Sequence, residues 1–279
     1  MSIFVSASDL VHDIYHGHKQ TVLASLWGPG EGEGLKIYQK GHLPTALFCD
    51  PAAALPGVPG SDVGRNPLPE SHHLQSWFRK WGLTEGGRVV VYDEGRGILA
   101  GRAWWILRWA GVDNIQILDG GLRAWEKLDL PVVGGPGNFT ASSDATVVEG
   151  QMPVATIEDA MNHSRNGGIL VDTRERNRFA GRREILDLKA GHIPGAVNVP
   201  VRELQNEDHS MRSPEEIRAV FAEVGVTEGT DVIVYSGSGN HSAFALAAME
   251  EAGLTGAAHF LGGWSQWSAN PRNPVEHGD

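Results

Sequence analysis

Short apolar runs alternate with helix-like stretches along both halves of the chain. Residues 89–92 (Val-Val-Val-Tyr) and 232–235 (Val-Ile-Val-Tyr) are uninterrupted apolar runs, which are typical of strands buried on both faces of a parallel sheet. Each run is followed by a Gly-rich turn and a helical pattern, over residues 101–109 in the first half and 242–251 in the second. A further strand is predicted at residues 115–118. This alternation predicts an α/β fold with mainly parallel sheets flanked by helices.

The second half of the chain repeats motifs of the first half in the same order. Gly-His-Leu-Pro at residues 41–44 recurs as Gly-His-Ile-Pro at residues 191–194. A Gly-Gly pair followed by a stretch ending in Trp occurs at residues 120–125 and again at residues 262–267. In each half one apolar run, at residues 89–92 or 232–235, lies between these two motifs. Ordered matches of this kind indicate that one domain has been duplicated.

The duplication predicts two domains of the same fold joined by a linker. The Gly-Gly-Pro-Gly sequence at residues 134–137 and the polar residues after it have the composition of a flexible connection. We therefore expect an N-terminal domain over residues 1–135 and a linker over residues 136–152. The C-terminal domain is expected over residues 153–279.

The amino-acid composition argues against several classes of binding partner. The 279 residues include 23 Lys and Arg against 34 Asp and Glu, which gives a formal net charge of −11. This acidic balance argues against nonspecific nucleic-acid binding and against anionic membrane surfaces, which both need a basic face. The single cysteine, Cys49, excludes an intrachain disulfide and a cysteine-based zinc site. Because the N-terminus also lacks a signal-peptide pattern, we expect a cytoplasmic protein with no membrane span and no metal.

Two turns follow the buried strands and precede helices, where ligands of parallel sheets bind. The turn at residues 93–97 carries Asp93 and Glu94, whose charges would repel an anion. The other turn, the 236–241 loop, consists of Ser236, Gly237, Ser238, Gly239, Asn240 and His241. Its small residues let successive backbone N–H groups point inward, at the positive end of the following helix, and predict an anion cradle. Alternatively, both turns are only tight connections.

Taken together, the motifs resemble the two-domain rhodanese family, the thiosulfate and 3-mercaptopyruvate sulfurtransferases. The matching pieces are Gly-His-Ile-Pro-Gly-Ala at residues 191–196, Tyr-Asp at 92–93 before Gly-Arg-Ala-Trp-Trp at 101–105, Leu-Asp-Gly-Gly at 118–121 and Gly-Trp-Ser-Gln-Trp at 263–267. The resemblance covers nearly the whole chain. It implies tandem rhodanese-like domains, a noncatalytic N-terminal copy, and a C-terminal loop that opens with a catalytic cysteine.

The family chemistry implied by this resemblance needs a sulfur atom on the loop. A thiolate attacks the sulfane sulfur of a small anionic donor, becomes a persulfide, and passes the sulfur to a thiol or to cyanide. The resemblance implies no metal and no organic cofactor. In this chain Ser236 stands at the cysteine position. A hydroxyl forms no stable persulfide and is a poor nucleophile without an adjacent base, so the chain as written is expected to be inactive.

Two explanations of Ser236 are open: an engineered replacement of cysteine, or natural divergence. The neighbouring positions also depart from the family pattern. Asn240 and His241 stand where mercaptopyruvate-type loops end in Val-Thr, and Asn66 stands where many bacterial relatives have His. A single engineered change would leave these neighbours unaltered. The departures therefore favour natural divergence.

The resemblance also implies which residues bind the donor. Arg178 matches the family arginine that grips the anionic end of the donor, although it could instead form only a surface salt bridge. Arg182 and Lys189 lie on the same predicted loop, with Lys189 where the family has a second arginine. Ser238 matches the loop serine of mercaptopyruvate-type enzymes and favours 3-mercaptopyruvate as the donor. His241 could stabilise an anion or act as a base towards Ser236.

Three other functions are compatible with parts of the sequence. The cradle could belong to a noncatalytic protein that binds a small anion or an acidic partner segment. Gly95 and Gly97, with Asp119 ending the next strand, resemble a dinucleotide fingerprint. A hydrolase could use Ser236 with His241, although no third group is visible to orient the histidine.

Overall fold

The computed structural model describes residues 2–138 and 143–278. The chain divides into two compact units, each of which is described by itself. The first contains the described residues up to Pro56, together with Pro69–Gln151 and Glu207–Ser210. The second contains Gly57–Leu68, Met152–Asn206 and the described residues from Met211 onwards. A segment from the first half of the sequence therefore belongs to the second unit.

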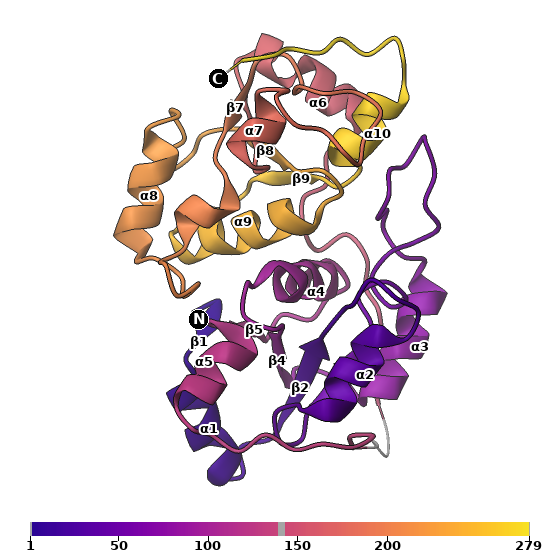
Figure 1. The fold of residues 1–279 in the computed structure, drawn as a ribbon, viewed down its shortest axis with the longest axis vertical. Helices are drawn as coiled ribbons and strands as arrows, with labels where there is room; N and C mark the ends of the chain where they lie inside the picture. Colours follow the sequence, from indigo (N-terminus) through magenta and orange to yellow (C-terminus); the bar gives the residue numbers. More distant parts are fainter. Residues whose placement is uncertain (1, 139–142, 279) are drawn as a thin grey trace. The chain divides into compact units, whose positions relative to one another are not determined.

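The first unit is built on a five-stranded parallel sheet with the strand order β1-β5-β4-β2-β3 (Figure 1). Its strands are β1 (Phe4–Val5), β2 (Gln20–Ser25), β3 (Leu47–Cys49), β4 (Arg88–Tyr92) and β5 (Ile115–Leu118). Its helices are α1 (Ala7–Tyr15), α2 (Glu33–Lys40), α3 (Ser71–Trp81), α4 (Ile98–Trp109) and α5 (Gly121–Lys127). The predicted strands at residues 89–92 and 115–118 are confirmed, and all eight of these residues are buried.

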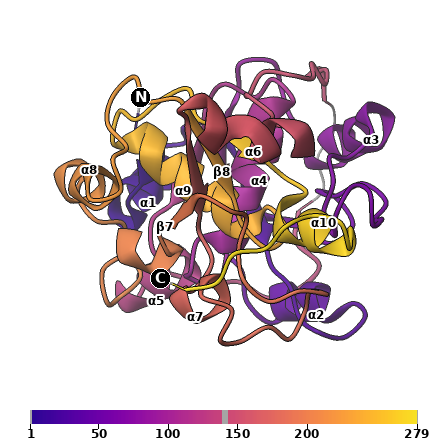
Figure 2. The ribbon, with the colours of Figure 1, turned by 90° about the horizontal axis from the view of Figure 1, so that it is seen from above.

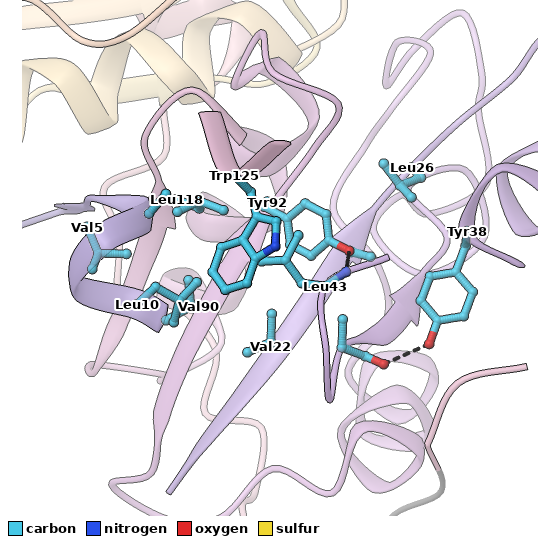
Figure 3. Close-up of a cluster of buried hydrophobic side chains, with 13 residues drawn as sticks. Val5, Leu10, Val22, Leu26, Tyr38, Leu43, Val90, Tyr92, Leu118 and Trp125 are labelled. Atoms are coloured by element: carbon cyan, nitrogen blue, oxygen red, sulfur yellow. Dashed lines mark hydrogen bonds between the residues drawn. The ribbon is translucent and has the colours of Figure 1, made fainter. Parts of the chain in front are cut away.

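The core of the first unit is apolar, with two tyrosines that keep their hydroxyl groups hydrogen-bonded. Val22, Val90 and Trp125 pack beside Tyr92 in this cluster (Figure 3). The Tyr92 hydroxyl accepts a hydrogen bond from the Leu43 N–H at 3.1 Å. Burial removes the Tyr92 phenol from water and raises its pKa well above the usual value. The cluster therefore buries polar atoms only where a backbone partner is present.

The second unit contains a four-stranded parallel sheet with the strand order β7-β6-β8-β9. Its strands are β6 (Ile169–Asp172), β7 (Ala196–Asn198), β8 (Val232–Tyr235) and β9 (Ala258–Phe260). Its helices are α6 (Ile157–His163), α7 (Arg176–Phe179), α8 (Pro214–Ala222), α9 (Asn240–Glu251) and α10 (Gly263–Ala269), with 3-10 turns η1 (Ser164–Asn166) and η2 (Val201–Leu204). Helix α9 lies against β8 (Figure 1, Figure 2). The predicted α/β fold with parallel sheets is confirmed in both units.

The repeated Gly-His-x-Pro motif makes the same bonds in each unit. The Nδ1 atom of His192 is 2.8 Å from the Phe179 carbonyl oxygen, and that of His42 is 2.9 Å from the Tyr38 carbonyl oxygen. The N–H of Ile193 donates to the Tyr235 hydroxyl at 3.2 Å, and the N–H of Leu43 donates to the Tyr92 hydroxyl in the same way. Both histidines thus bond the backbone of a preceding helix, and the residue after each bonds the tyrosine at the end of a central strand, so the role of the motif is structural.

Among the described residues, no helix is both long enough and apolar enough to cross a membrane.

Candidate active site

The 236–241 loop connects β8 to α9 and accepts hydrogen bonds from the first turn of α10. The N–H of Trp264 donates to the Ser236 carbonyl at 2.8 Å, and the N–H of Ser265 donates to the Gly237 carbonyl at 2.9 Å. Gly239 has φ = +83°, a left-handed conformation that favours glycine. The Ser236 side chain is fully buried, and its Oγ accepts the N–H of Gly239 at 3.1 Å. The loop is therefore wrapped around the hydroxyl of its first residue.

A chain of buried hydrogen bonds leads from Ser236 to a histidine. Ser236 Oγ lies 3.1 Å from Ser242 Oγ, which lies 2.7 Å from His259 Nε2. All three residues are fully buried. Ser242 is in the first part of α9, and His259 is in β9, where it pairs with Val234. This arrangement can pass a proton between the Ser236 hydroxyl and the imidazole through Ser242.

Sequence reasoning missed His259 and considered His241 as the base instead. The structure places His241 exposed in the first turn of α9, and the hydrogen bonds of the Ser236 hydroxyl run to Gly239 and Ser242. The signal that could have found His259 was an isolated histidine inside an apolar strand, Ala-Ala-His-Phe-Leu at residues 257–261.

The segment of residues 57–68 lies against the 236–241 loop within the second unit. Asn66 Nδ2 donates to Ser238 at two atoms, the carbonyl oxygen at 3.2 Å and Oγ at 3.0 Å. The same amide lies 3.4 Å from Asn240 Oδ1. The N–H of Arg65 donates to Ser265 Oγ at 3.1 Å. This segment therefore fixes the orientation of the Ser238 hydroxyl and brings Arg65 to the loop.

Two guanidinium groups approach the loop at Gly237. A Cβ atom built on Gly237 would lie 3.2 Å from Arg65 Nη2 and 3.4 Å from Arg178 Nη1, so glycine leaves the space that both arginines use. Arg178 Nη2 donates to Glu184 and to Asp187, at 2.9 Å in each case. Arg65 Nη1 is paired with Asp187. Arg178 thus forms salt bridges, and it forms them beside the loop.

Glu184 organises the turn that carries Asp187. Its Oε1 accepts the N–H groups of Ile185, Leu186 and Asp187 at 2.9, 2.9 and 3.1 Å. Burial alone would raise the pKa of the Glu184 carboxyl. The backbone N–H groups and Arg178 outweigh burial and hold this pKa below its usual value.

The other two predicted donor-binding residues lie differently. Lys189 Nζ donates to the carbonyl oxygens of Asn270 and Asn273 at 2.7 and 2.8 Å, so this ammonium ties down the chain after α10. Arg182 is exposed, with its backbone N–H bonded to the Asn177 carbonyl. The guanidinium groups that reach Gly237 are those of Arg65, which sequence reasoning did not select, and of Arg178.

A cavity of about 370 Å³ adjoins these groups in the second unit. Its walls are Arg65 and other residues between 59 and 65, residues 186–188, and Ser265, Ser268 and Ala269 of α10. Asp187 and Arg65 thus line a space that a small molecule can enter.

The corresponding turn of the first unit is already filled by its own side chain. The Asp93 carboxylate accepts the N–H groups of Gly95, Gly97 and Leu99 at 2.8, 2.9 and 3.0 Å. These are the backbone groups that a dinucleotide pyrophosphate would need. The geometry of this turn therefore argues against the dinucleotide alternative.

Cys49 does not have the environment of a reactive thiol. It is fully buried at the end of β3, and burial raises the pKa of its thiol well above the usual value. No cluster of three or more His, Cys, Asp and Glu side chains suited to a metal ion occurs within residues 2–138 and 143–278.

Comparison with known proteins gives a consistent result. The sequence model of the Rhodanese-like domain family matches residues 29–128 and 156–270 of this chain. A putative thiosulfate sulfurtransferase of Mycobacterium tuberculosis is 35% identical over 281 residues, covering 99% of this chain and 97% of that protein. A probable 3-mercaptopyruvate sulfurtransferase of Pseudomonas aeruginosa is 35% identical over 254 residues, covering 88% of each. The crystal structure of a 3-mercaptopyruvate sulfurtransferase from Escherichia coli superposes with a TM-score of 0.82 at 29% identity, covering 95% of this chain and 100% of that one.

Proposed function

The chain belongs to the family of proteins built from rhodanese-like domains, and from that premise we propose a specific function for its second unit. The 236–241 loop is a sulfurtransferase site of the thiosulfate/3-mercaptopyruvate type that binds a small anionic sulfur donor. With Ser236 in place of a sulfur nucleophile, the chain as written does not turn the donor over. The observation that carries this proposal is the position of Ser236 Oγ, buried at the start of the loop and bonded to the N–H of Gly239.

The reaction expected at this site needs a thiolate at the position of the Ser236 oxygen. There the N–H of Gly239 would donate to the sulfur and stabilise its anion. The thiolate attacks the outer sulfur of thiosulfate or the thiol sulfur of 3-mercaptopyruvate, and a new S–S bond forms on the protein. The S–S bond of thiosulfate breaks and releases sulfite, or the C–S bond of 3-mercaptopyruvate breaks and releases the enolate of pyruvate, which takes up the proton that the new persulfide gives up. A thiol or cyanide then takes the outer sulfur, and the thiolate is regenerated. No step requires a cofactor or a metal ion.

The donor would be held by groups already assembled at the loop. Arg178 provides the cation that orients its anionic end, and Arg65 supports it from the 57–68 segment. Ser238 can donate a hydrogen bond to the donor because Asn66 Nδ2 donates to its oxygen and leaves the Ser238 proton available. A serine that can polarise a carbonyl oxygen suits a keto acid such as 3-mercaptopyruvate.

Natural divergence accounts for Ser236 better than an engineered change. Asn66 and Asn240, which both depart from the family pattern, are hydrogen-bond neighbours at 3.4 Å. Ser236 itself is satisfied by Gly239 and by Ser242. Departures that contact one another and leave their polar groups paired form a single altered arrangement, which one isolated substitution would not produce.

The test compares the chain as written with Ser236→Cys, using 3-mercaptopyruvate and thiosulfate as donors and cyanide as acceptor. The serine form is expected to release no thiocyanate, and the cysteine form is expected to gain activity and to carry one extra sulfur atom by intact mass. If the folded cysteine form is also inactive while thiosulfate still stabilises the protein, the site is a noncatalytic anion-binding site. If neither donor binds, the proposal is wrong.

A further inference from the structure

A carboxylate of the chain itself lies between the two arginines of the proposed donor site. One Asp187 oxygen is paired with Arg65, and the other accepts from Arg178 Nη2 at 2.9 Å. The Asp187 side chain is 3% exposed, whereas those of Arg65 and Arg178 are 38% and 21% exposed. The same two guanidiniums reach the 236–241 loop at Gly237. Asp187 therefore pairs with the two guanidinium groups that an anionic donor would need to bind.

The described bonds of the Asp187 carboxylate go to guanidinium groups, whereas the turn around it is built by Glu184. Glu184 accepts three successive backbone N–H groups and pairs with Arg178. The neighbouring side chains of Leu186 and Leu188 are 65% and 82% exposed, so packing does little to hold this segment in place. Asp187 can consequently lose its charge, or move into the adjoining cavity, without dismantling the turn.

The charge balance at this place decides which anions are favoured. Arg65, Arg174 and Arg178 contribute three positive charges, and Asp172, Glu184 and Asp187 contribute three negative charges, so the six groups are neutral together. A dianion brought to this cluster meets the Asp187 carboxylate with twice the charge of a monoanion. A monoanion has less repulsion to overcome and can use the Ser238 hydroxyl as well.

We propose that Asp187 determines the donor specificity of this site, by competing for Arg65 and Arg178 and thereby selecting monoanionic keto-acid donors over dianionic thiosulfate. The inference rests on the proposed function in that it takes the 236–241 loop as the place where the donor binds. It adds the class of donor and the residue responsible for the choice.

The experiment measures binding to the chain as written, in which Ser236 prevents turnover. Dissociation constants for thiosulfate and 3-mercaptopyruvate are determined by calorimetry for the native chain, Asp187→Asn and Glu203→Gln. The last variant is a matched control, since Glu203 forms an exposed pair with Arg176 in the same unit and its loss changes the net charge equally. Thermal unfolding of each variant verifies that it is folded.

Asp187→Asn is expected to bind thiosulfate about tenfold more tightly, the lower end of what a charge-assisted bond contributes. Binding of 3-mercaptopyruvate should improve by a smaller factor, and Glu203→Gln should change neither. Adding Arg65→Gln to Asp187→Asn should abolish the gain for thiosulfate. Arg65→Gln alone serves if Asp187→Asn does not fold, and it should weaken thiosulfate binding more than 3-mercaptopyruvate binding.

Equal gains for both donors, no gain, or the same gain in Glu203→Gln would each overturn the specificity role of Asp187. This outcome is distinguishable from failure of the proposed function. An inactive Ser236→Cys form together with tighter thiosulfate binding in Asp187→Asn would leave the specificity role standing and remove the sulfur-transfer reaction.

Discussion

Replacing Arg174 by methionine should destabilise the second unit more than any surface charge change in it. Arg174 follows β6, and its side chain is 1% exposed beside a completely buried Asp172. Its Nε lies 3.1 and 3.0 Å from the two Asp172 carboxylate oxygens, and its Nη2 lies 2.6 Å from one of them. Nη2 also donates to the Gly191 carbonyl at 2.7 Å, and the guanidinium lies 4.6 Å from the Trp264 ring centre.

The magnitude follows from what remains after the arginine is removed. Asp172 would keep the N–H of residue 174 as a donor but would lose the guanidinium that pairs with it, and Glu184, 3.7 Å from Arg174 Nη1, would lose one of its cationic partners. Breaking one side of a buried pair costs about 3 to 5 kcal/mol, because the other charge stays buried without compensation. For a unit of this size, that loss corresponds to a fall in Tm of about 10 °C or more. Burial alone would lower the pKa of Arg174, but the neighbouring Asp172 and Glu184 carboxylates outweigh burial and raise this pKa above its usual value, so the guanidinium stays charged.

The assay is chemical unfolding followed by tryptophan fluorescence, in a double-mutant cycle. Arg174→Met alone should cost the full amount, whereas the double variant Asp172→Leu with Arg174→Met should recover most of it, since Asp172 is then no longer buried without its partner and Glu184 keeps Arg178. Arg176→Met, in the exposed pair with Glu203, should cost less than about 1 kcal/mol. A cost below about 1 kcal/mol for Arg174→Met, or a double variant as unstable as the sum of the two single variants, would refute the reasoning.

Three further predictions concern the loop and its surroundings. Gly237→Ala places a methyl group against both guanidiniums and should weaken thiosulfate binding severalfold in calorimetry, with little change in Tm. The pKa of Glu184 is held below its usual value of 4.5, so its carboxylate stabilises the fold above pH 4.5, and this contribution disappears as the pH falls through the lower folded-state pKa. Glu184→Gln should therefore lower the Tm at pH 7, and the Tm of this variant should fall less on acidification than that of the native chain. Ser242→Ala interrupts the buried hydrogen-bond chain and should lower the unfolding free energy by about 1 to 2 kcal/mol, an effect that Ser242→Thr should partly restore.

Local patterns in the sequence predicted the fold because the strands and turns are local features. The runs at residues 89–92 and 232–235 are apolar throughout because both faces of their sheets are covered, and this shows directly in the residue types. The Gly-His-x-Pro motif is contiguous in the chain and occurs in both halves, so it reveals the duplication directly. The 236–241 loop was recognisable because its glycines and its place after a buried strand are contiguous in the chain.

The groups that surround the loop could not be predicted in the same way, because they arrive from distant parts of the sequence. His259 reaches Ser242 because β9 pairs in parallel with β8, and this register is not visible in either strand alone. Arg65 reaches the loop through a segment of the first half that belongs to the second unit. Asp187 resembles any charged residue of a polar loop until its two guanidinium partners are known.

The duplicated turns show how one position decides whether an anion can be bound. Asp93 follows Tyr92 at the end of β4, as Ser236 follows Tyr235 at the end of β8. In the first unit the residue at this position is a carboxylate that takes several N–H groups of the following turn, and the place for a ligand is permanently filled. In the second unit a neutral hydroxyl takes the N–H of Gly239, and the buried Asp187 carboxylate, which pairs with the two arginines beside the loop, lies outside the turn. Asp93 lies within the turn itself and fills it, whereas Asp187 lies outside the turn and is held by two part-exposed arginines that a ligand can reach, so the second unit is the copy suited to binding an anion.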